Sequence, residues 1–195
     1  MIAARNLPVG DAVVADHQAA GRGRLGRRWE GPSGSGLFVT FVLAFDPLAV
    51  FRCGVATALA CGPEVRLKWP NDVTLDGRKV GGVLGEVHAD RVLVGIGVNL
   101  TWAPPGAALL GEDRDVLLER LTPLIERWSA EDPAAVVDRW CSLSETLGQR
   151  VRVELPGETF DGIAENVALD GALIVDGRRV IAGDVTRLRP LTEPA

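Results

Sequence analysis

The chain has 195 residues, which suits one medium-sized domain or one domain with a small appendage. Hydrophobic residues make up 47% of it, enough for a core, and the net charge of −5 argues against general affinity for nucleic acid. No run approaches the roughly 18 apolar residues of a membrane span, and the first residues lack the apolar centre of a signal peptide. The cysteines, Cys53, Cys61 and Cys141, are odd in number and have no metal-like spacing. We therefore expect a cytoplasmic protein with reduced thiols and no membrane contact.

The first three quarters of the chain mix strand and helix patterns. Apolar, β-branched runs predict strands at 13–16, 37–45, 65–69, 73–75, 79–83 (which 84–87 can extend) and 92–100. Asp76-Gly77 lies between two of them and predicts a hairpin. Apolar residues at helical spacing, with Pro47 and Pro133 near two of the starts, predict helices at 47–61, 112–128 and 133–147. The core face of the second helix would be formed by Val116, Leu117, Leu121, Leu124, Ile125 and Trp128.

The pattern changes after Gly148. Short strands separated by Asp-Gly pairs are predicted at 151–155, 160–166, 172–175, 179–182 and 185–188. Five short strands in about 40 residues are typical of a small SH3-like β-barrel. We therefore expect a domain at 1–147 and a small C-terminal domain at 148–195.

One loop carries the densest positive charge of the chain. It packs four arginines and three glycines into nine residues: Gly21-Arg22-Gly23-Arg24-Leu25-Gly26-Arg27-Arg28-Trp29. Arginine forks match phosphate and carboxylate oxygens, and glycines let backbone N–H groups approach an anion closely. This arginine loop (Gly21–Trp29) therefore predicts a local anion site. A solvated basic turn is the plainer interpretation, but it leaves Trp29 unexplained.

The same glycines also fit the G-x-G-x-x-G fingerprint of dinucleotide-binding folds. That motif needs a helix directly after it. The residues that follow Trp29 include Pro32, Gly34 and Gly36, which do not begin a regular helix. The sequence therefore disfavours a Rossmann site, and the arginines would have to supply most of the positive charge.

A second motif is the pentapeptide Lys68-Trp69-Pro70-Asn71-Asp72. The lysine ends a strand on the face opposite the apolar residues, and the proline stops that strand. Amide and carboxylate oxygens follow at once. A cation, an amide and a carboxylate together suit a nucleotide with its magnesium ion. Taken alone, the motif is explained better by an ordinary strand–turn–strand.

Four motifs in this order closely resemble those of the biotin–protein ligases, that is, biotin–[acetyl-CoA carboxylase] ligases. They are the segments 15–29, 68–73, 79–86 and 95–99. The resemblance extends over nearly the whole chain, including the small C-terminal barrel. Lipoate ligases and octanoyl transferases share the fold and a lysine but lack the arginine loop and the pentapeptide. The resemblance implies an α+β fold, in which a mixed or antiparallel sheet is flanked by helices as in class II synthetases and is followed by the SH3-like barrel.

The resemblance also implies a two-step reaction. Biotin and MgATP would give biotinyl-5′-AMP, and a lysine of a biotin carboxyl carrier domain, from acetyl-CoA carboxylase or a related enzyme, would then take the biotin. By similarity, the residues that contact biotin or the adenylate are Gln18, Gly21, Arg22, Gly23, Arg24, Arg27, Trp29, Lys68, Gly81, Gly82 and Asn99.

Several of these residues have a specific expected role. Lys68 and Arg24 are the expected catalytic residues, and Arg27 would hold phosphates. Trp29 would cover the adenine, which Asn99 would also meet. Gly81 and Gly82 would leave room for the biotin bicycle, and Asp72 would lie near the magnesium ion.

The chain also departs from the family pattern. Family members carry a Ser-Thr-Asn motif for the biotin ureido group upstream of the arginine loop, and this chain begins just after that point, with no winged-helix segment for DNA. Without those polar partners we expect weaker biotin binding, since buried polar groups of the ligand would lack partners. Two alternatives follow: a nucleotide-binding homologue with impaired catalysis, and, less favoured by the motifs, a lipoyl or octanoyl ligase.

Overall fold

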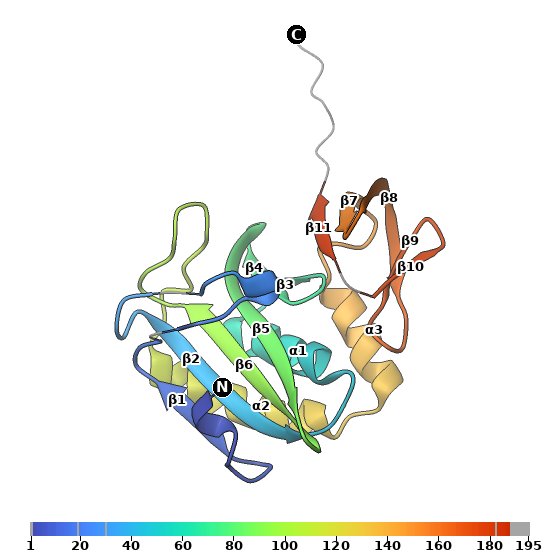
Figure 1. Cartoon of the computed structure of the whole chain (residues 1–195). Helices are drawn as coiled ribbons and strands as arrows, with labels where there is room; N and C mark the ends of the chain where they lie inside the picture. Colours follow the sequence, from blue (N-terminus) through green and yellow to red (C-terminus); the bar gives the residue numbers. More distant parts are fainter. Residues whose placement is uncertain (1, 19, 30, 182, 188–195) are drawn as a thin grey trace.

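A six-stranded antiparallel sheet forms the larger part of the molecule (Figure 1). The computed structural model describes residues 2–18, 20–29, 31–181 and 183–187. The strand order is β1-β2-β6-β5-β4-β3, and every neighbouring pair is antiparallel. The strands are β1 (Ala12–Ala15), β2 (Gly36–Ala44), β3 (Val65–Lys68), β4 (Asp72–Leu75), β5 (Arg78–His88) and β6 (Arg91–Asn99). All six expected strands are confirmed, as is the hairpin at Asp76-Gly77, where both residues have positive φ, 51° and 69°.

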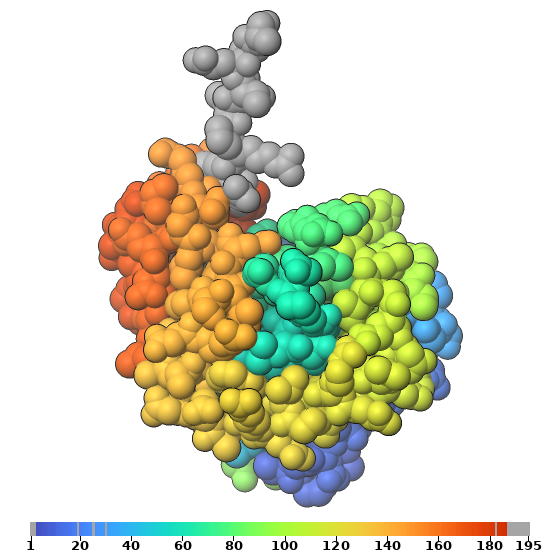
Figure 2. All heavy atoms as spheres, turned by 180° about the vertical axis from the view of Figure 1, so that it is seen from behind, coloured from blue at the N-terminus to red at the C-terminus, as the bar shows by residue number. Residues whose placement is uncertain are grey.

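Three helices cover one face of this sheet. The central helix α1 (Ala49–Cys61) is buried along nearly its whole length and contacts β3, β5 and β6. Helix α2 (Arg114–Ser129) packs on α1 and β2, and α3 (Pro133–Leu143) packs on α1 and β3. From behind, α2 and α3 form much of the outer surface (Figure 2). The three α-helices do not cover the opposite face of the sheet, where the short 3₁₀ turn Ile2–Ala4 contacts β1 and β2. None of the helices among the described residues is long and apolar enough to cross a membrane.

The helix predictions were right in number but not in every boundary or face. Helix α2 begins after Asp113, whose side chain accepts the N–H groups of Asp115 and Val116, an ordinary N-cap. Val116, predicted to lie on the core face, is 47% exposed because it sits in the first turn, beyond the edge of the packing surface. Helix α1 begins two residues later than predicted.

The predicted helix at 133–147 is too long by four residues. Helix α3 ends at Leu143. The hydroxyl of Ser144 accepts the N–H groups of Thr146 and Leu147, and the N–H of Glu145 donates to Leu67 O of β3. These residues therefore exchange helical hydrogen bonds for contacts with the sheet, a tertiary effect that helical spacing does not reveal.

The C-terminal strands form a second, five-stranded sheet with the order β10-β9-β8-β7-β11. Its strands are β7 (Arg150–Leu155), β8 (Glu158–Val167), β9 (Leu173–Val175), β10 (Arg178–Val180) and β11 (Asp184–Arg187). The long β8 pairs with β7 through its first half and with β9 through its second, so one strand is shared between two ribbons, as in small barrels. Two predicted strands reach Ala182 and Leu188, which lie outside the described residues. The α+β class is confirmed, whereas the domain boundary at 147/148 stays a prediction.

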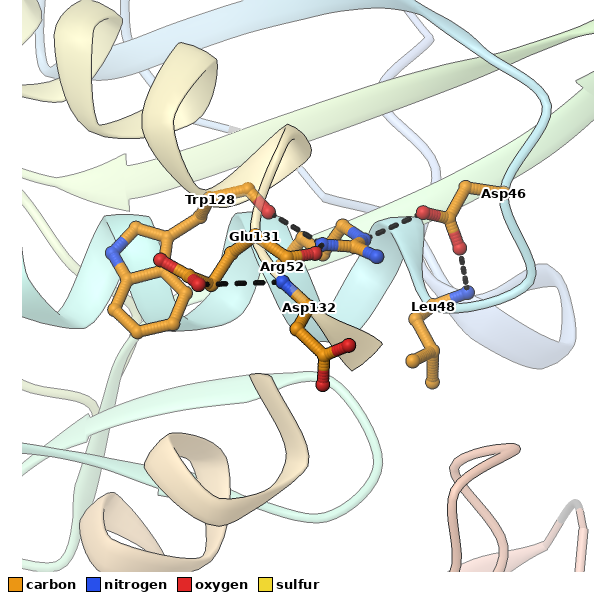
Figure 3. A network of polar contacts seen from close by, with 6 residues as sticks. All are labelled: Asp46, Leu48, Arg52, Trp128, Glu131 and Asp132. Atoms are coloured by element: carbon orange, nitrogen blue, oxygen red, sulfur yellow. Dashed lines mark hydrogen bonds and ion pairs between the residues drawn. The ribbon is translucent and has the colours of Figure 1, made fainter. Parts of the chain in front are cut away.

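A buried arginine joins α1 to the end of α2 (Figure 3). Arg52 is 6% exposed, and its Nη1 donates to Trp128 O and Glu131 O, each at 2.7 Å. Its Nε donates to the carboxylate of Asp46, which also accepts the N–H of Leu48. Helices end with unpaired carbonyl groups, so one guanidinium here satisfies carbonyls at the C-terminus of α2 and ties α1 to it.

We predict that Arg52→Met lowers the free energy of unfolding by about 2–4 kcal/mol, because it leaves two carbonyls and a carboxylate without their donor. Chemical denaturation of the two proteins measures the difference. The control is Arg66→Met, which removes an exposed arginine bonded only to local carbonyls and should cost less than about 0.5 kcal/mol. Equal effects of the two substitutions would contradict the structural role of Arg52.

Candidate functional site

An open cavity of about 1050 Å³ lies on the sheet face that the helices leave uncovered. Alternation along the strands explains its floor, because successive side chains point to opposite faces. In β2, Phe38 and Thr40 line the cavity, whereas Leu37 and Val39 belong to the core beneath it. The walls come from the arginine loop, from residues 68–72 and from the C-terminal sheet. Segments far apart in sequence therefore meet in one place.

Nearly all of the sequence-predicted site residues line this cavity. They are Gln18, Gly21, Arg22, Gly23, Arg24, Arg27, Trp29, Lys68, Asp72 and Gly82. The two predicted residues outside its lining are Asn99 and Gly81. Asn99 is 7% exposed, and its Nδ2 donates to Ala108 O at 3.2 Å. A side chain at Gly81 would come within 2.7 Å of Gly97 O, so this glycine permits close packing of β5 on β6. The roles expected of all these residues stay predictions.

The arginine loop is closed by its own backbone. Gly23 N–H donates to Arg27 O at 2.6 Å, and Trp29 N–H donates to Gly21 O at 3.0 Å. A single 3₁₀ turn, Arg24–Gly26, forms its tip. The next regular element among the described residues is β2, so no helix follows the glycines and the dinucleotide-fold interpretation is contradicted. The loop presents its arginines from a short ribbon.

The tip of the loop reaches the C-terminal sheet. Arg27 pairs with the carboxylate of Asp184 at the start of β11, and Nη1 of Arg24 lies 3.4 Å from Gly183 O. Arg24 is half-buried, and burial lowers the pKa of its guanidinium from the ordinary value, while the carboxylates of Asp184 and Asp72 act in the opposite direction. Asp184 was not predicted as a site residue. Nothing in the sequence near it distinguishes it from the other acidic residues of the chain.

Trp29 rests on the floor of the cavity. Two residues that contact it there, Gly97 and Lys79, were not among the predicted site residues. A Cβ at Gly97 would lie only 2.6 Å from Nε1 of Trp29, so the indole needs a glycine beneath it. The ammonium group of Lys79 lies 5.2 Å from the centroid of the Trp29 ring. Gly97 and Lys79 both belong to motifs that were identified in the sequence. Their contact with Trp29 is visible only in the structure.

The charged pentapeptide also lines the cavity. Lys68 ends β3 and is the register partner of Asp72, whose carboxylate forms an ion pair with Lys79. Within the part of the chain that the structure describes, no carboxylate pairs with Lys68. Lys68 and Lys79 are the two lysines of the whole sequence, and both line the cavity.

A metal ion would have few protein ligands here. The described residues contain no group of three His, Cys, Asp or Glu side chains that could hold one. A single carboxylate such as that of Asp72 is compatible with a magnesium ion that arrives with phosphate oxygens, because Mg²⁺ often takes one or two carboxylates and completes its shell with phosphate and water. The chemistry of the cavity is therefore that of an anion site with an aromatic ring beside it, where cations and preorganised N–H groups can stabilise charge on a ligand.

Comparisons with known proteins show which proteins the chain is similar to. Residues 2–101 match the model of the Biotin/lipoate A/B protein ligase family, and residues 146–187 match the Biotin protein ligase C terminal domain. The chain is 36% identical to the biotin–[acetyl-CoA-carboxylase] ligase of Mycobacterium tuberculosis, over 92% of this chain and 80% of the relative. It is also 36% identical to that of Paracoccus denitrificans, over 85% of this chain and 83% of the relative. The biotin protein ligase of Aquifex aeolicus, solved with biotin and ATP, superposes with a TM-score of 0.83 at 27% identity, covering 96% of this chain and 94% of that one.

We predict that Gly97→Ala displaces Trp29 from the cavity floor, because the added methyl group would overlap the indole. The measurement is acrylamide quenching of Trp29 fluorescence, isolated by subtracting the same variant with Trp29→Phe. The matched control is Gly82→Ala in the paired position on β5, where the nearest atom to a new Cβ is 3.4 Å away at the end of the flexible Lys79 side chain. Unchanged quenching in Gly97→Ala would show that the indole does not rest there.

Proposed function

The chain belongs to the biotin/lipoate A/B protein ligase family, and we propose that it works as a biotin–[acetyl-CoA-carboxylase] ligase. In the first step a carboxylate oxygen of biotin attacks the α-phosphorus of ATP, pyrophosphate leaves, and biotinyl-5′-AMP forms. In the second step the amine of a carrier lysine attacks the acyl carbon, an amide bond forms, and AMP leaves. The observation that carries this function is that the arginine loop and Lys68 line the same cavity in a chain so similar to known ligases.

The charges of the cavity suit the first step. Biotin carboxylate and ATP are both anions, so their approach needs positive charge from the protein. We assign that role to Lys68, Arg24 and Arg27. No protein nucleophile is needed, because positioning and electrostatic stabilisation can carry phosphoryl chemistry of this kind. Asp184 is the carboxylate paired with Arg27, and a phosphate of the nucleotide would take its place.

Further assignments belong to the same proposal. Asp72 would hold the magnesium ion of MgATP, which would neutralise phosphate charge, and would leave its ion pair with Lys79 to do so. Trp29 would stack on the adenine, and Asn99 would approach it from the end of β6. The acceptor would be a lysine of a biotin carboxyl carrier domain, and the reaction would take place in the cytoplasm.

The decisive experiment is biotin-dependent exchange of labelled pyrophosphate into ATP, followed by transfer of biotin to a purified carrier domain. Exchange and transfer together would establish the ligase. Titration calorimetry with biotin and MgATP distinguishes an active ligase from a nucleotide-binding homologue with impaired catalysis. The impaired homologue would bind ATP, would not bind biotin and would show no pyrophosphate exchange. Exchange with lipoate or octanoate in place of biotin would identify a ligase of the related class.

We predict that Lys68→Ala reduces the exchange rate by about 10²–10³-fold, because it removes an unpaired cation that stabilises charge in the transition state. Steady-state exchange at saturating ATP measures the loss, and thermal unfolding checks that the fold persists. Arg66→Ala on the same strand is exposed and outside the cavity, so it serves as the matched control. Retention of near-normal exchange in Lys68→Ala would remove this lysine from its assigned role.

We predict that Arg24→Ala releases biotinyl-5′-AMP early, because the half-buried guanidinium that would hold the adenylate under the loop is lost. The measurement is the fraction of labelled adenylate that stays with the protein through rapid gel filtration, together with biotin incorporated into a bystander protein such as albumin. We expect retention to fall and bystander labelling to rise. Wild-type retention of the adenylate would contradict the assignment.

A further inference from the structure

The segment between the two sheets is joined to the strand that carries Lys68. Strand β3 is the last strand of the large sheet, so its outer backbone groups need partners from outside the sheet. Ser144 forms a parallel bridge with Leu67, and Glu145 N–H donates to Leu67 O at 2.9 Å. Two residues after Leu67, just beyond the end of β3, Trp69 N–H donates to Oγ1 of Thr146 at 2.9 Å. The backbone is thus fixed on both sides of Lys68 by consecutive residues of the connecting segment.

Of the contacts just described with Leu67 and Trp69, the one from Thr146 is made by a side chain, through its hydroxyl group. Thr146 is 4% exposed and Trp69 is 2% exposed, so water does not replace the hydrogen bond between them. The hydroxyl of Ser144 in turn accepts Thr146 N–H at 3.1 Å, which sets the position of Thr146. Thr146 does not line the cavity. Its effect on a ligand must therefore pass through the backbone at Trp69.

The same tryptophan extends the connection to the C-terminal sheet. Its Nε1 donates to Gly171 O at 3.0 Å, in the turn between β8 and β9. A side chain on Gly171 would meet Phe51 of α1 at 2.9 Å, so this turn packs closely against the helical layer. Trp69 therefore lies between the cavity, the connecting segment and the second sheet, with Lys68 directly before it in the chain.

We propose that Thr146 is a positioning residue for Lys68, and that through it the connecting segment sets the placement of the lysine in the cavity. The kinetic part of this inference rests on the proposed ligase function. Lys68 has no carboxylate partner among the described residues, so its placement depends on the backbone of β3 and on packing. A displacement of the order of 1 Å at such a group can cost about 10²-fold in rate.

The experiment compares Thr146→Val, Thr146→Ser and Thr57→Val with the wild-type chain. Valine keeps the shape of threonine and removes the acceptor, whereas serine keeps the acceptor. Thr57 is the matched control: it is also buried, and its hydroxyl donates to Cys53 O within α1, so its loss leaves the hydrogen bonds between β3 and the connecting segment in place. Thermal unfolding reports the stability of each variant, and biotin-dependent pyrophosphate exchange reports kcat and the KM for ATP.

We expect Thr146→Val to lower kcat about tenfold or more with a smaller change in KM, because the lost interaction acts mainly on the transition state. Thr146→Ser should restore kcat even where its melting temperature stays lowered. Thr57→Val should keep the wild-type kcat. Equal kcat in Thr146→Val and Thr57→Val, or no recovery in Thr146→Ser, would overturn the proposal.

A second measurement does not depend on ligase activity. Trace acetylation followed by mass spectrometry gives the rate at which each lysine reacts, and the chain offers Lys79 as the internal reference for Lys68. We expect Thr146→Val to change the Lys68-to-Lys79 ratio at least about twofold and Thr57→Val to leave it unchanged. An unchanged Lys68-to-Lys79 ratio in Thr146→Val overturns the proposal. If the ratio changes but the wild-type chain shows no biotin-dependent pyrophosphate exchange, only the proposed function is overturned.

Discussion

Positive charges must be gathered closely enough to receive an anion, yet they repel one another. Beside three of the six lysine and arginine side chains that line the cavity, the protein places a carboxylate from another segment. Arg27 pairs with Asp184, Lys79 pairs with Asp72, and Arg22 lies 3.8 Å from Glu86. Such pairs offset part of this repulsion, and in the proposed function a phosphate would replace the carboxylate at Arg27.

That arrangement depends on a sheet with two different faces. The face under α1 is apolar, and burial of the whole helix against it anchors the strands. Along the cavity the other face carries glycines at Gly82, Gly95 and Gly97, beside larger residues such as Phe38, so that a flat ring and a ligand can approach the backbone there. The same strands therefore pack against the helices on one face and line the cavity on the other.

The C-terminal sheet takes part in both tasks. It brings Asp184 to the tip of the arginine loop, and its β8–β9 turn receives the indole N–H of Trp69. The connecting segment closes the outer edge of β3 at the same place. The C-terminal sheet has no chemically distinctive motif of its own, yet its residues line part of the cavity.

The sequence by itself determined the strands and the number of helices, because alternation and helical spacing are local properties of the chain. Its motifs, through their resemblance to a known family, also predicted ten of the residues that line the cavity. It did not reveal where α3 ends, since Ser144 to Thr146 leave the helix for partners on β3. Nor did it reveal that Gly97 and Lys79 surround Trp29, or that Asp184 faces Arg27. These are contacts between residues distant in sequence, and only the packing of the two sheets decides which of many similar side chains meet.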